Sequence, residues 1–463
     1  MSTSAQTPAV LRHLLIGSWI FLAGCVGPER DYFDAEAAPP KVPVADAAAS
    51  TQPSHGAVPE SFPLHPALAG QSLSLGRVLA LVAAGNPDLM ASSAGVAAVA
   101  ARRIDAGKLA NPEGGILFED FSGQHPANAQ TTLLLSQAIP LTGKLGHQQA
   151  LARGESVVAQ HEYDIKRLEV FAEAARTFIA LLVAQQRTAL ASEQLALVER
   201  LSAAEEAQVE AGQLAPFERS RALAAVAEAR LRVNEARRDV QVLRQRLVSF
   251  WSGDAASFRE VAADLVRLPP TPALPVLLAR LDNSPEIVRS ASEIELRRAA
   301  LALERARATP DIAMAGGIRR HDGDGTYDFV AGVTVPLPVV TQNQSAITEA
   351  ARRQQQAQFQ LAGAKNRLRA TISEDYERLT SIAAEIEALQ KTLIPASENA
   401  VSALREGYKA RKFRLSELLI AEQSLAALRD KLLTTLGSYH LNYVDLEQLL
   451  GGDLYGQPTP RSR

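Results

Sequence analysis

The residues whose types could support chemistry are few and scattered along the chain. His321-Asp322-Gly323-Asp324-Gly325 has the residue types of a metal-binding loop, but a calcium loop is longer and ends in a bidentate glutamate, which is missing here. Gly-Asp-Gly is also ordinary turn chemistry. Gly143-Lys144 lacks the preceding glycines of a phosphate-binding loop, and no nucleophile is followed by a suitably spaced base. The sequence therefore predicts no enzyme, no resident metal and no cofactor.

Cys25 is the only cysteine, so neither an internal disulfide nor a cysteine-based zinc site is available. It follows Arg12-His13, an apolar run from Leu14 to Ala23, and Gly24. This order is typical of a secretory signal, and the run is too short to span a bilayer. Leu22-Ala23-Gly24-Cys25 resembles the bacterial lipobox, so we expect cleavage before Cys25 and acylation of its thiol. An ordinary signal peptide with a chance cysteine is the alternative.

The residues after Cys25 predict an anchor and a tether. Lipoproteins retained in the inner membrane usually carry Asp after the cysteine, whereas Val26 stands here, which implies sorting to the outer membrane. Lipid chains contribute about 0.8 kcal/mol per buried methylene, so a multiply acylated cysteine anchors stably. Residues 26 to about 70 carry many prolines, and we expect an extended tether there.

Composition excludes two broad classes of protein. The 463 residues are 47% hydrophobic and 21% charged, with a formal net charge of −3. Disordered chains combine low hydrophobicity with high net charge, so disorder is excluded as the overall state. Nucleic-acid binding normally needs a basic face, which this charge does not supply, so we expect no nucleic-acid partner.

Beyond the tether the chain repeats itself. Asn86-Pro87 and Ser284-Pro285 each open a helix, 198 residues apart, and Ala211 to Ala222 can be laid on Ala410 to Ala421, 199 residues apart. We expect each copy to contain a helix of about 25 residues, ending at Ala110 in the first copy, then two short strands, a very long helix, a turn and a final helix.

The long helices are too long for a globular domain. The 67 residues from Leu145 to Ala211 contain no proline, and at 1.5 Å per residue they would extend about 100 Å. Their apolar residues alternate three and four apart, which predicts coiled-coil seams between neighbouring helices. These residues are Ile165, Leu168, Ala172, Ala175, Ile179 and Leu182 in copy one, and Leu379, Ile382, Ile386, Leu389 and Leu393 in copy two. Pro395 should kink the second long helix.

Four segments alternate as strands, at about Glu113–Phe121, Thr131–Leu141, Asp311–Arg320 and Tyr327–Leu337. Each is close to the roughly 9 to 11 residues that a tilted strand needs to cross a bilayer; a soluble four-stranded sheet is the alternative. Four strands cannot close a barrel in lipid, where unpaired edges cost several kcal/mol per backbone group. The chain must then associate with copies of itself, giving eight strands from two chains or twelve from three.

These features together resemble the outer-membrane factors of tripartite efflux systems, the TolC family. The resemblance covers about residues 72 to 452. Leu109-Ala110-Asn111-Pro112-Glu113, Glu119-Asp120-Phe121 and Ser136-Gln137-Ala138-Ile139-Pro140-Leu141-Thr142-Gly143-Lys144 look most like its heavy-metal, CzcC-like branch. The resemblance implies a mainly α protein with a small transmembrane β part, in which two tandem repeats form long coiled-coil α-hairpins. It also implies a homotrimer whose twelve-stranded β-barrel continues into a periplasmic α-helical barrel.

The family resemblance also implies partners and a gate. The partners are a periplasmic adaptor and an inner-membrane proton-driven pump of the RND type. The gate would lie at the hairpin turns, where Glu417 matches the family's first gate acid and Tyr408 its linking tyrosine, while Ile420 replaces the second acid and Arg411 the usual turn glycine. We expect one ring of three Glu417 carboxylates.

The turns should also carry a latch and the adaptor-docking surface. We expect Glu218 to pair with Arg411 or Arg414 as the latch. Docking should use the turn residues Gly212, Gln213, Leu214, Ala215, Lys412 and Phe413, because that end faces the inner membrane. The structural alternative is that these charges are solvated side chains on helical turns.

The expected organisation is a signal peptide (1–24), a lipidated tether (25–71), a first efflux-protein repeat (72–254), a linker (255–271), a second repeat (272–452) and a C-terminal tail (453–463). The predicted function is that of an outer-membrane efflux channel, with heavy-metal cations as cargo. The alternatives are a multidrug efflux lipoprotein of the same fold, a periplasmic adaptor lipoprotein with one hairpin and an all-β remainder, and a lipid-anchored hydrolase.

Overall fold

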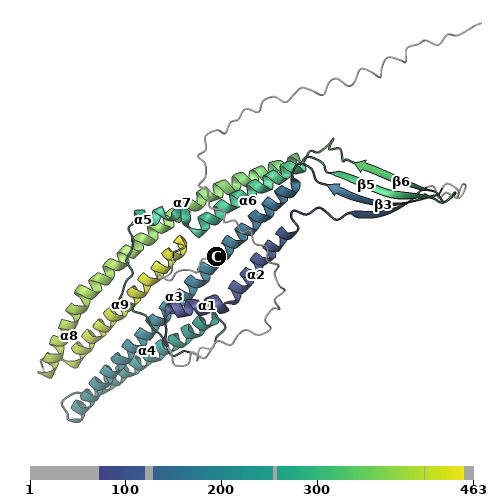
Figure 1. The fold of residues 1–463 in the computed structure, drawn as a ribbon. Coiled ribbons are helices and arrows are strands. Elements are labelled where there is room, and N and C mark those ends of the chain that lie inside the picture. The colour runs from purple at the N-terminus through teal and green to yellow at the C-terminus, as the bar shows by residue number, and fades with distance from the viewer. Residues whose placement is uncertain (1–71, 120–128, 254–257, 411, 453–463) are drawn as a thin grey trace, which may run out of the picture. The chain divides into compact units, whose positions relative to one another are not determined.

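A computed structural model describes residues 72–119, 129–253, 258–410 and 412–452. The predicted signal peptide, the whole tether with Cys25, and the C-terminal tail lie outside these ranges. The first part of the chain contains β1 (Ser72–Leu73), α1 (Leu75–Gly85), α2 (Pro87–Ala101), the 3-10 helix η1 (Arg102–Ile104), β2 (Glu113–Glu119), β3 (Gln130–Ile139), α3 (Lys144–Glu210), α4 (Pro216–Ser249) and β4 (Glu260–Val261) (Figure 1).

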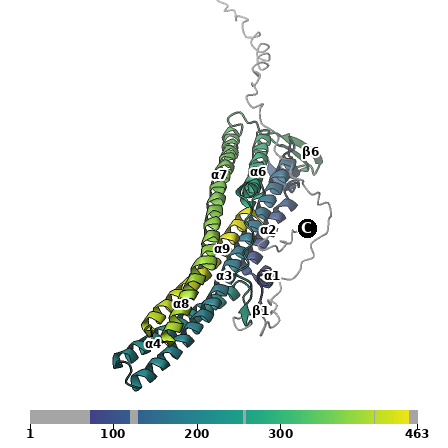
Figure 2. The same cartoon turned by 90° about the vertical axis from the view of Figure 1, so that its left-hand side faces the viewer.

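The second part contains α5 (Leu274–Ala279), the 3-10 helix η4 (Leu281–Asn283), α6 (Pro285–Arg307), β5 (Ile312–His321), β6 (Tyr327–Thr334), α7 (Gln344–Ala388), the π-helix η5 (Leu389–Leu393), α8 (Ile394–Lys409) and α9 (Leu415–Leu450). The order of long elements is the same in both parts: helix, two strands, long helix, turn, final helix. The predicted tandem repeat is therefore confirmed, with α8 continuing α7 (Figure 2).

In each repeat, an equivalent hydrogen bond joins the start of an early helix to the end of the last helix. Asn86 caps α2, and its side-chain amide donates to the Phe250 carbonyl at the end of α4 (2.8 Å). Ser284 precedes α6, and its hydroxyl donates to the Leu449 carbonyl near the end of α9 (2.8 Å). In each repeat, a side chain just before an early helix thus fixes the end of the last helix.

The first helix of copy one is shorter than expected. The pattern predicted a helix ending at Ala110, but α2 ends at Ala101 and η1 at Ile104. Beyond η1, Gly107 lies against the side chain of Gln149 on α3, since a Cβ there would come within 1.7 Å of the Gln149 side-chain nitrogen. The helix α1, which the sequence analysis missed, precedes α2.

The long helices match their predicted lengths, with one local correction. α3 has 67 residues, and its seam residues Ala172, Ala175, Ile179 and Leu182 are buried. In copy two Leu379, Ile386 and Leu389 are buried, but Leu393 is 47% exposed, so its assignment to the seam was wrong.

The π-helix explains that correction. Ile394 N–H donates to the carbonyl of Leu389, five residues back, immediately before Pro395. A proline ring clashes with the carbonyl four residues earlier in an α-helix, and a π turn moves that carbonyl away. The extra residue also rotates Leu393 off the seam.

The four predicted strands form one antiparallel sheet in the order β2-β3-β5-β6. β3 pairs with β5 from Gln130–His321 to Ile139–Ile312, which joins the two repeats. β2 and β6 are the edges of this sheet. The predicted starts at Glu113 and Tyr327 match the observed ones, and the other predicted ends within the described residues differ by one to three residues.

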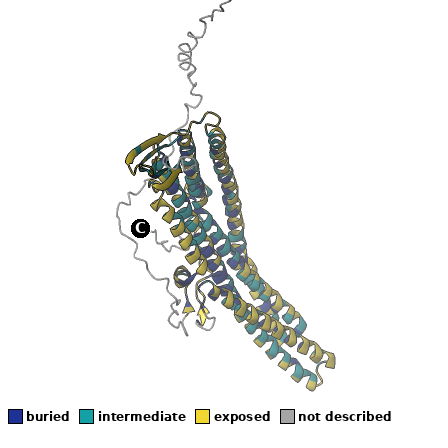
Figure 3. Ribbon diagram, turned by 90° about the vertical axis from the view of Figure 1, so that its right-hand side faces the viewer, coloured by how far each residue is buried: buried dark blue, intermediate teal, exposed yellow. Residues whose placement is uncertain are grey.

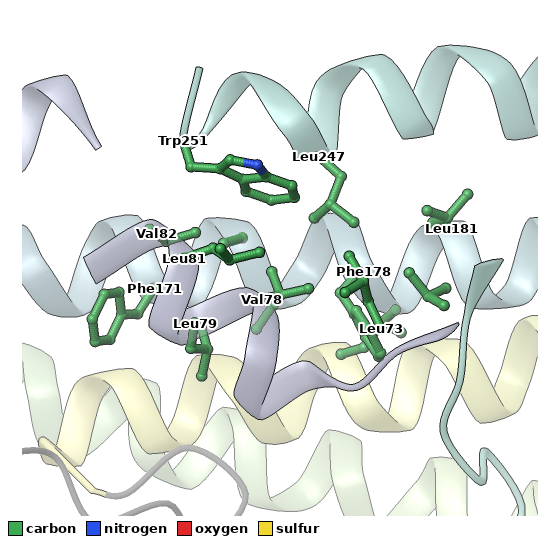
Figure 4. Close-up of a cluster of buried hydrophobic side chains, with 14 of the residues drawn as sticks. Leu73, Val78, Leu79, Leu81, Val82, Phe171, Phe178, Leu181, Leu247 and Trp251 are labelled. Atoms are coloured by element: carbon green, nitrogen blue, oxygen red, sulfur yellow. The ribbon is translucent and has the colours of Figure 1, made fainter. Parts of the chain in front are cut away.

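Hydrophobic burial holds the first repeat together where α1 lies on α3. Val78 and Val82 of α1 pack with Phe178 of α3, while Leu247 and Trp251 close the cluster at the end of α4 (Figure 4). Leu73 joins the same cluster from β1, which pairs in parallel with β4. Trp251 therefore packs at a helix junction.

The sheet, in contrast, exposes its apolar side chains, and most of it is exposed in Figure 3. Cross-strand pairing places Ile116, Leu133, Ile318 and Phe329 in one row on one face, and each of them is exposed. None of the described helices combines the length and apolar character needed to cross a membrane.

Candidate gate at the hairpin tips

Helices α3 and α4 form one hairpin and α8 and α9 the other, and each hairpin ends in an equivalent backbone hydrogen bond. Gln213 N–H donates to the Gln208 carbonyl in the first turn (2.9 Å), and Lys412 N–H donates to the Gly407 carbonyl in the second (2.8 Å). The two donors are 199 residues apart, as the sequence alignment predicted. Gly212 has a φ of 71°, which a glycine adopts without strain.

The first tip buries an acidic residue that the sequence analysis missed. Glu205 of α3 is 2% exposed and faces α4. Its Oε1 lies 3.9 Å from Arg221 Nη2, beyond hydrogen-bonding distance, and its Oε2 has no hydrogen-bond partner. Burial raises the pKa of the Glu205 carboxyl; Arg221 opposes this shift and the negative Glu218 adds to it.

The structure differs from the predicted latch. Glu218 pairs with Arg221 at 3.0 Å, three residues later on the same helix, and within the described chain no ion pair joins Glu218 to Arg414. Positions three apart on a helix lie on one face, so α4 itself supplies the partner. Arg411, the other predicted partner, lies outside the described residues.

The second tip has a well-paired buried acid and an apolar cluster. Glu422 of α9 is 5% exposed, and its Oε1 lies 2.5 Å from Arg405 Nη2 on α8. Val401, Leu415 and Leu418 are buried beside this pair's helices and form one hydrophobic cluster. The pair therefore joins α8 and α9 across a packed interface.

Glu417, the predicted gate acid, caps its own helix. Its Oε2 accepts a hydrogen bond from the Arg414 backbone N–H at 3.0 Å, and the residue is exposed in the first turn of α9. An acid at this position also interacts favourably with the helix dipole. A ring of three Glu417 carboxylates requires three chains and stays a prediction.

Tyr408 links the two tips. The side-chain amide of Gln208 on α3 donates to the Tyr408 hydroxyl on α8 at 3.3 Å, and Tyr408 also packs against the hydrophobic cluster of the second tip. Figures 1 and 2 show the two tips side by side. The resemblance implied a linking role for this tyrosine, and within one chain it bridges the two hairpins.

Two further links between the hairpins were missed from the sequence. Arg187 of α3 lies 2.8 Å from Asp430 of α9, and Arg176 lies 2.6 Å from Asp445. Their partners are more than 240 residues apart in the chain, so no local pattern could have indicated them. These ion pairs continue the polar contacts along α3 and α9 away from the tips.

The predicted docking residues are mostly accessible. Gly212, Gln213, Ala215, Lys412 and Phe413 are exposed and Leu214 is half-buried. Phe413 also lies against its own hairpin, since a Cβ at Gly407 would come within 2.2 Å of its ring. Among the described residues, no group of three or more His, Cys, Asp or Glu side chains is placed to hold a metal ion.

Tandem hairpins, a joined four-stranded sheet and polar links at the tips together define a helical conduit protein of the efflux type. The family model of outer membrane efflux proteins matches residues 78–253 and 277–452. The chain belongs to the outer membrane efflux protein family.

Its relatives carry the names of metal-resistance proteins. The chain is 28% identical over 389 residues to the cobalt-zinc-cadmium resistance protein CzcC of Cupriavidus metallidurans, covering 84% of this chain and 92% of CzcC. It is 27% identical over 278 residues to the nickel-cobalt-cadmium resistance protein NccC of Alcaligenes xylosoxydans xylosoxydans, covering 59% of this chain and 63% of NccC.

Solved structures support the fold. The outer membrane channel CmeC of Campylobacter jejuni superposes with a TM-score of 0.68 at 16% identity, covering 89% of this chain and 94% of CmeC. The predicted fold class, a mainly helical tandem repeat of the TolC type, is therefore confirmed.

Proposed function

We propose that three copies of this chain form an outer-membrane channel that exports heavy-metal cations. The observation that carries the proposal is the described sheet, which exposes an apolar face and has two edges, β2 and β6. In a bilayer such a face would contact lipid, but its edges would leave backbone groups unpaired at several kcal/mol each. A second copy supplies the missing partner strand.

The strand directions allow copies of the chain related by rotation to close a barrel. Each of the three pairings in the order β2-β3-β5-β6 is antiparallel, so β2 and β6 run in opposite directions. A neighbouring copy's β2 placed beside β6 therefore continues the antiparallel pattern. Three copies give twelve strands, within the range of known barrels, and their hairpins would form the periplasmic tunnel.

The remaining assignments follow from this placement. We propose that Cys25 carries the lipid anchor, that residues 25–71 form the tether, and that the turns of the two repeats dock a periplasmic adaptor linked to an inner-membrane pump. The family is one of efflux channels, which supports a transport role without catalysis. Two α-hairpins and a four-stranded sheet disagree with the adaptor alternative, which predicts one hairpin and an all-β remainder.

The cargo assignment is supported by relatives whose names contain cobalt, zinc, cadmium or nickel. A strain lacking this protein should become hypersensitive to one or more of cobalt, zinc, cadmium, nickel and copper, and the wild-type gene should restore resistance. Hypersensitivity to drugs alone would instead favour the multidrug alternative.

We propose that the three Glu417 carboxylates narrow and charge the periplasmic end. Glu417→Ala should raise single-channel conductance or reduce block by divalent cations in planar bilayers, although it also removes a helix cap that contributes about 1 kcal/mol. Glu417→Gln is the matched control for the cap, because its amide oxygen can still accept from Arg414 N–H. If both variants behave like the unmodified channel, Glu417 is not part of a gate.

A further inference from the structure

The second face of the sheet, opposite the apolar row, is made mostly of small or uncharged residues. Pairing places Gly115, Ser136, Ala138, Ala313, Ala315, Gly317, Gly332 and Thr334 on this face, together with the larger Leu117, Leu134 and Val330. Its charged side chains gather at the end where the strands enter their connecting loops, with Glu113 at the opposite end. Small side chains leave room in a pore, so this charged group would lie close to passing ions.

The first members of the group are Arg319 and Glu119. Arg319 Nη2 lies 3.0 Å from Glu119 Oε2, and its Nε donates to the hydroxyl of Thr132 at 3.1 Å. Thr132 is directly opposite Arg319 on β3 and is buried. Side chains of β2 and β3 therefore hold the Arg319 guanidinium in place.

The second members are His321 and Asp328. Asp328 pairs directly with Arg319 across β5 and β6, and His321 Nε2 lies 2.7 Å from Asp328 Oδ2. The two acids of the described β5–β6 connection have hydrogen-bond partners of their own. Asp322 lies 3.5 Å from Arg320 and accepts from Thr131, while Asp324 accepts from Thr326.

Carboxylates outnumber guanidinium groups in this cluster. Glu119 and Asp328 provide two carboxylates, and Arg319 provides one fixed positive charge. Three copies around a pore would repeat this excess three times at one level. Charges of this kind near a narrow aqueous path concentrate counter-ions and exclude co-ions.

We propose that Glu119, Arg319, His321 and Asp328 form a charge ring at the outer end of the pore, and that this ring makes the channel prefer cations. The inference rests on the trimeric channel proposed above and deepens it by naming the residues that select the charge of the cargo. The Arg319 guanidinium reduces the negative charge of the ring. The Asp328 carboxylate contributes most to that charge because it is more exposed than Glu119.

Two adjacent arginines provide a matched test. Arg319 lies on the small-residue face, whereas Arg320 lies on the apolar face, opposite Thr131 and Tyr327. Both variants Arg319→Gln and Arg320→Gln remove one positive charge at nearly the same height. If the small-residue face lines the pore and the apolar face contacts lipid, only Arg319→Gln should change ion selectivity.

The experiment reconstitutes the full chain in planar bilayers and measures the reversal potential in a potassium chloride gradient. Asp328→Asn should lower the potassium-to-chloride permeability ratio by about twofold or more, and Arg319→Gln should raise it by a similar factor. Arg320→Gln should leave it unchanged. Should Arg319→Gln fail to assemble, the comparison of Asp328→Asn with Arg320→Gln decides the question.

The outcomes separate the two proposals. If the unmodified protein conducts but Asp328→Asn keeps its permeability ratio, the ring does not select ions and the inference is wrong, while the channel stands. An equal change in Asp328→Asn and Arg320→Gln would also overturn it, because position on the sheet face would then not matter. If the unmodified protein does not conduct, the channel proposal itself fails.

Discussion

The two hairpin tips each bury one glutamate, but they pair it differently. In the second tip Glu422 meets Arg405 at 2.5 Å. In the first tip Glu205 is 3.9 Å from Arg221, because that arginine is closer to Glu218, at 3.0 Å. Two acids thus compete for one base in the first tip, while the second has a matched pair.

The packing around the two acids also favours the second tip, which buries larger apolar side chains. Leu415 and Leu418 are buried in the second tip and contact Leu201 of the first hairpin. The first tip buries the smaller Ala222 and Val226 on α4. Local opening requires less free energy where little apolar surface is buried and a charge is left poorly paired. We therefore expect the first tip to open more readily than the second.

Arg405→Ala should produce the largest effect. It leaves the Glu422 carboxylate buried without its partner, which we expect to cost about 2 to 3 kcal/mol, less than for a fully buried pair because Arg405 is half exposed. Amide hydrogen exchange in α8 and α9 should accelerate accordingly. Arg405→Lys, which keeps the charge, should retain most of the protection, and equal loss in both variants would mean that packing of the longer side chain matters instead.

Glu205→Gln should act in the opposite direction. The neutral amide removes a buried charge that Arg221 pairs only poorly, so we expect the first tip to gain about 1 kcal/mol. Exchange of the amides flanking the turn between α3 and α4 should slow. Glu206→Gln is the matched control, since Glu206 forms a half-exposed ion pair with Arg219; faster exchange in Glu205→Gln would contradict the account.

Tyr408→Phe should loosen the contact between the tips. It removes the hydrogen bond from Gln208, which we expect to contribute about 0.5 to 1.5 kcal/mol, while the ring keeps its packing. Both tips should then exchange faster, and resting conductance in bilayers should increase. An effect confined to the second tip would show that the hydroxyl does not join the hairpins.

The smallest expected effect is a pH dependence of the first tip. The folded-state pKa of Glu205 lies above the ordinary value of 4.5, so the folded tip binds this proton more tightly than the unfolded chain does. Stability is therefore gained as pH falls through the folded pKa and lost as pH rises through it. Exchange rates corrected for their intrinsic pH dependence should show this trend, and Glu205→Gln should abolish it.

Much of the fold could be predicted from the sequence because its signals are periodic and local. The 67-residue helix, the strand segments and the 199-residue offset all follow from spacing that a reader can count. The early end of α2 and the π-helix could not be predicted in the same way. Gly107, beyond the end of η1, lies against the Gln149 side chain, a contact that sequence spacing does not indicate, and Leu393 leaves the seam because the helix winding changes before Pro395.

The site was predicted less completely, for a related reason. The turns and the linking tyrosine were located from the repeat and the resemblance, but Glu205, Arg187 and Asp430 gain their roles from partners on other helices. In the sequence they look like ordinary charges on solvated helix faces. The gate implied by the resemblance led us to expect a partner for Glu218 on the other hairpin, whereas its own helix provides Arg221.

The central claim is that a chain whose sheet has two unpaired edges forms a pore by assembling with its own copies. The most direct test determines the mass of the purified full-length protein in detergent and records its conductance in a planar bilayer. We predict a complex of three chains that conducts ions. A single chain that conducts none would contradict the account.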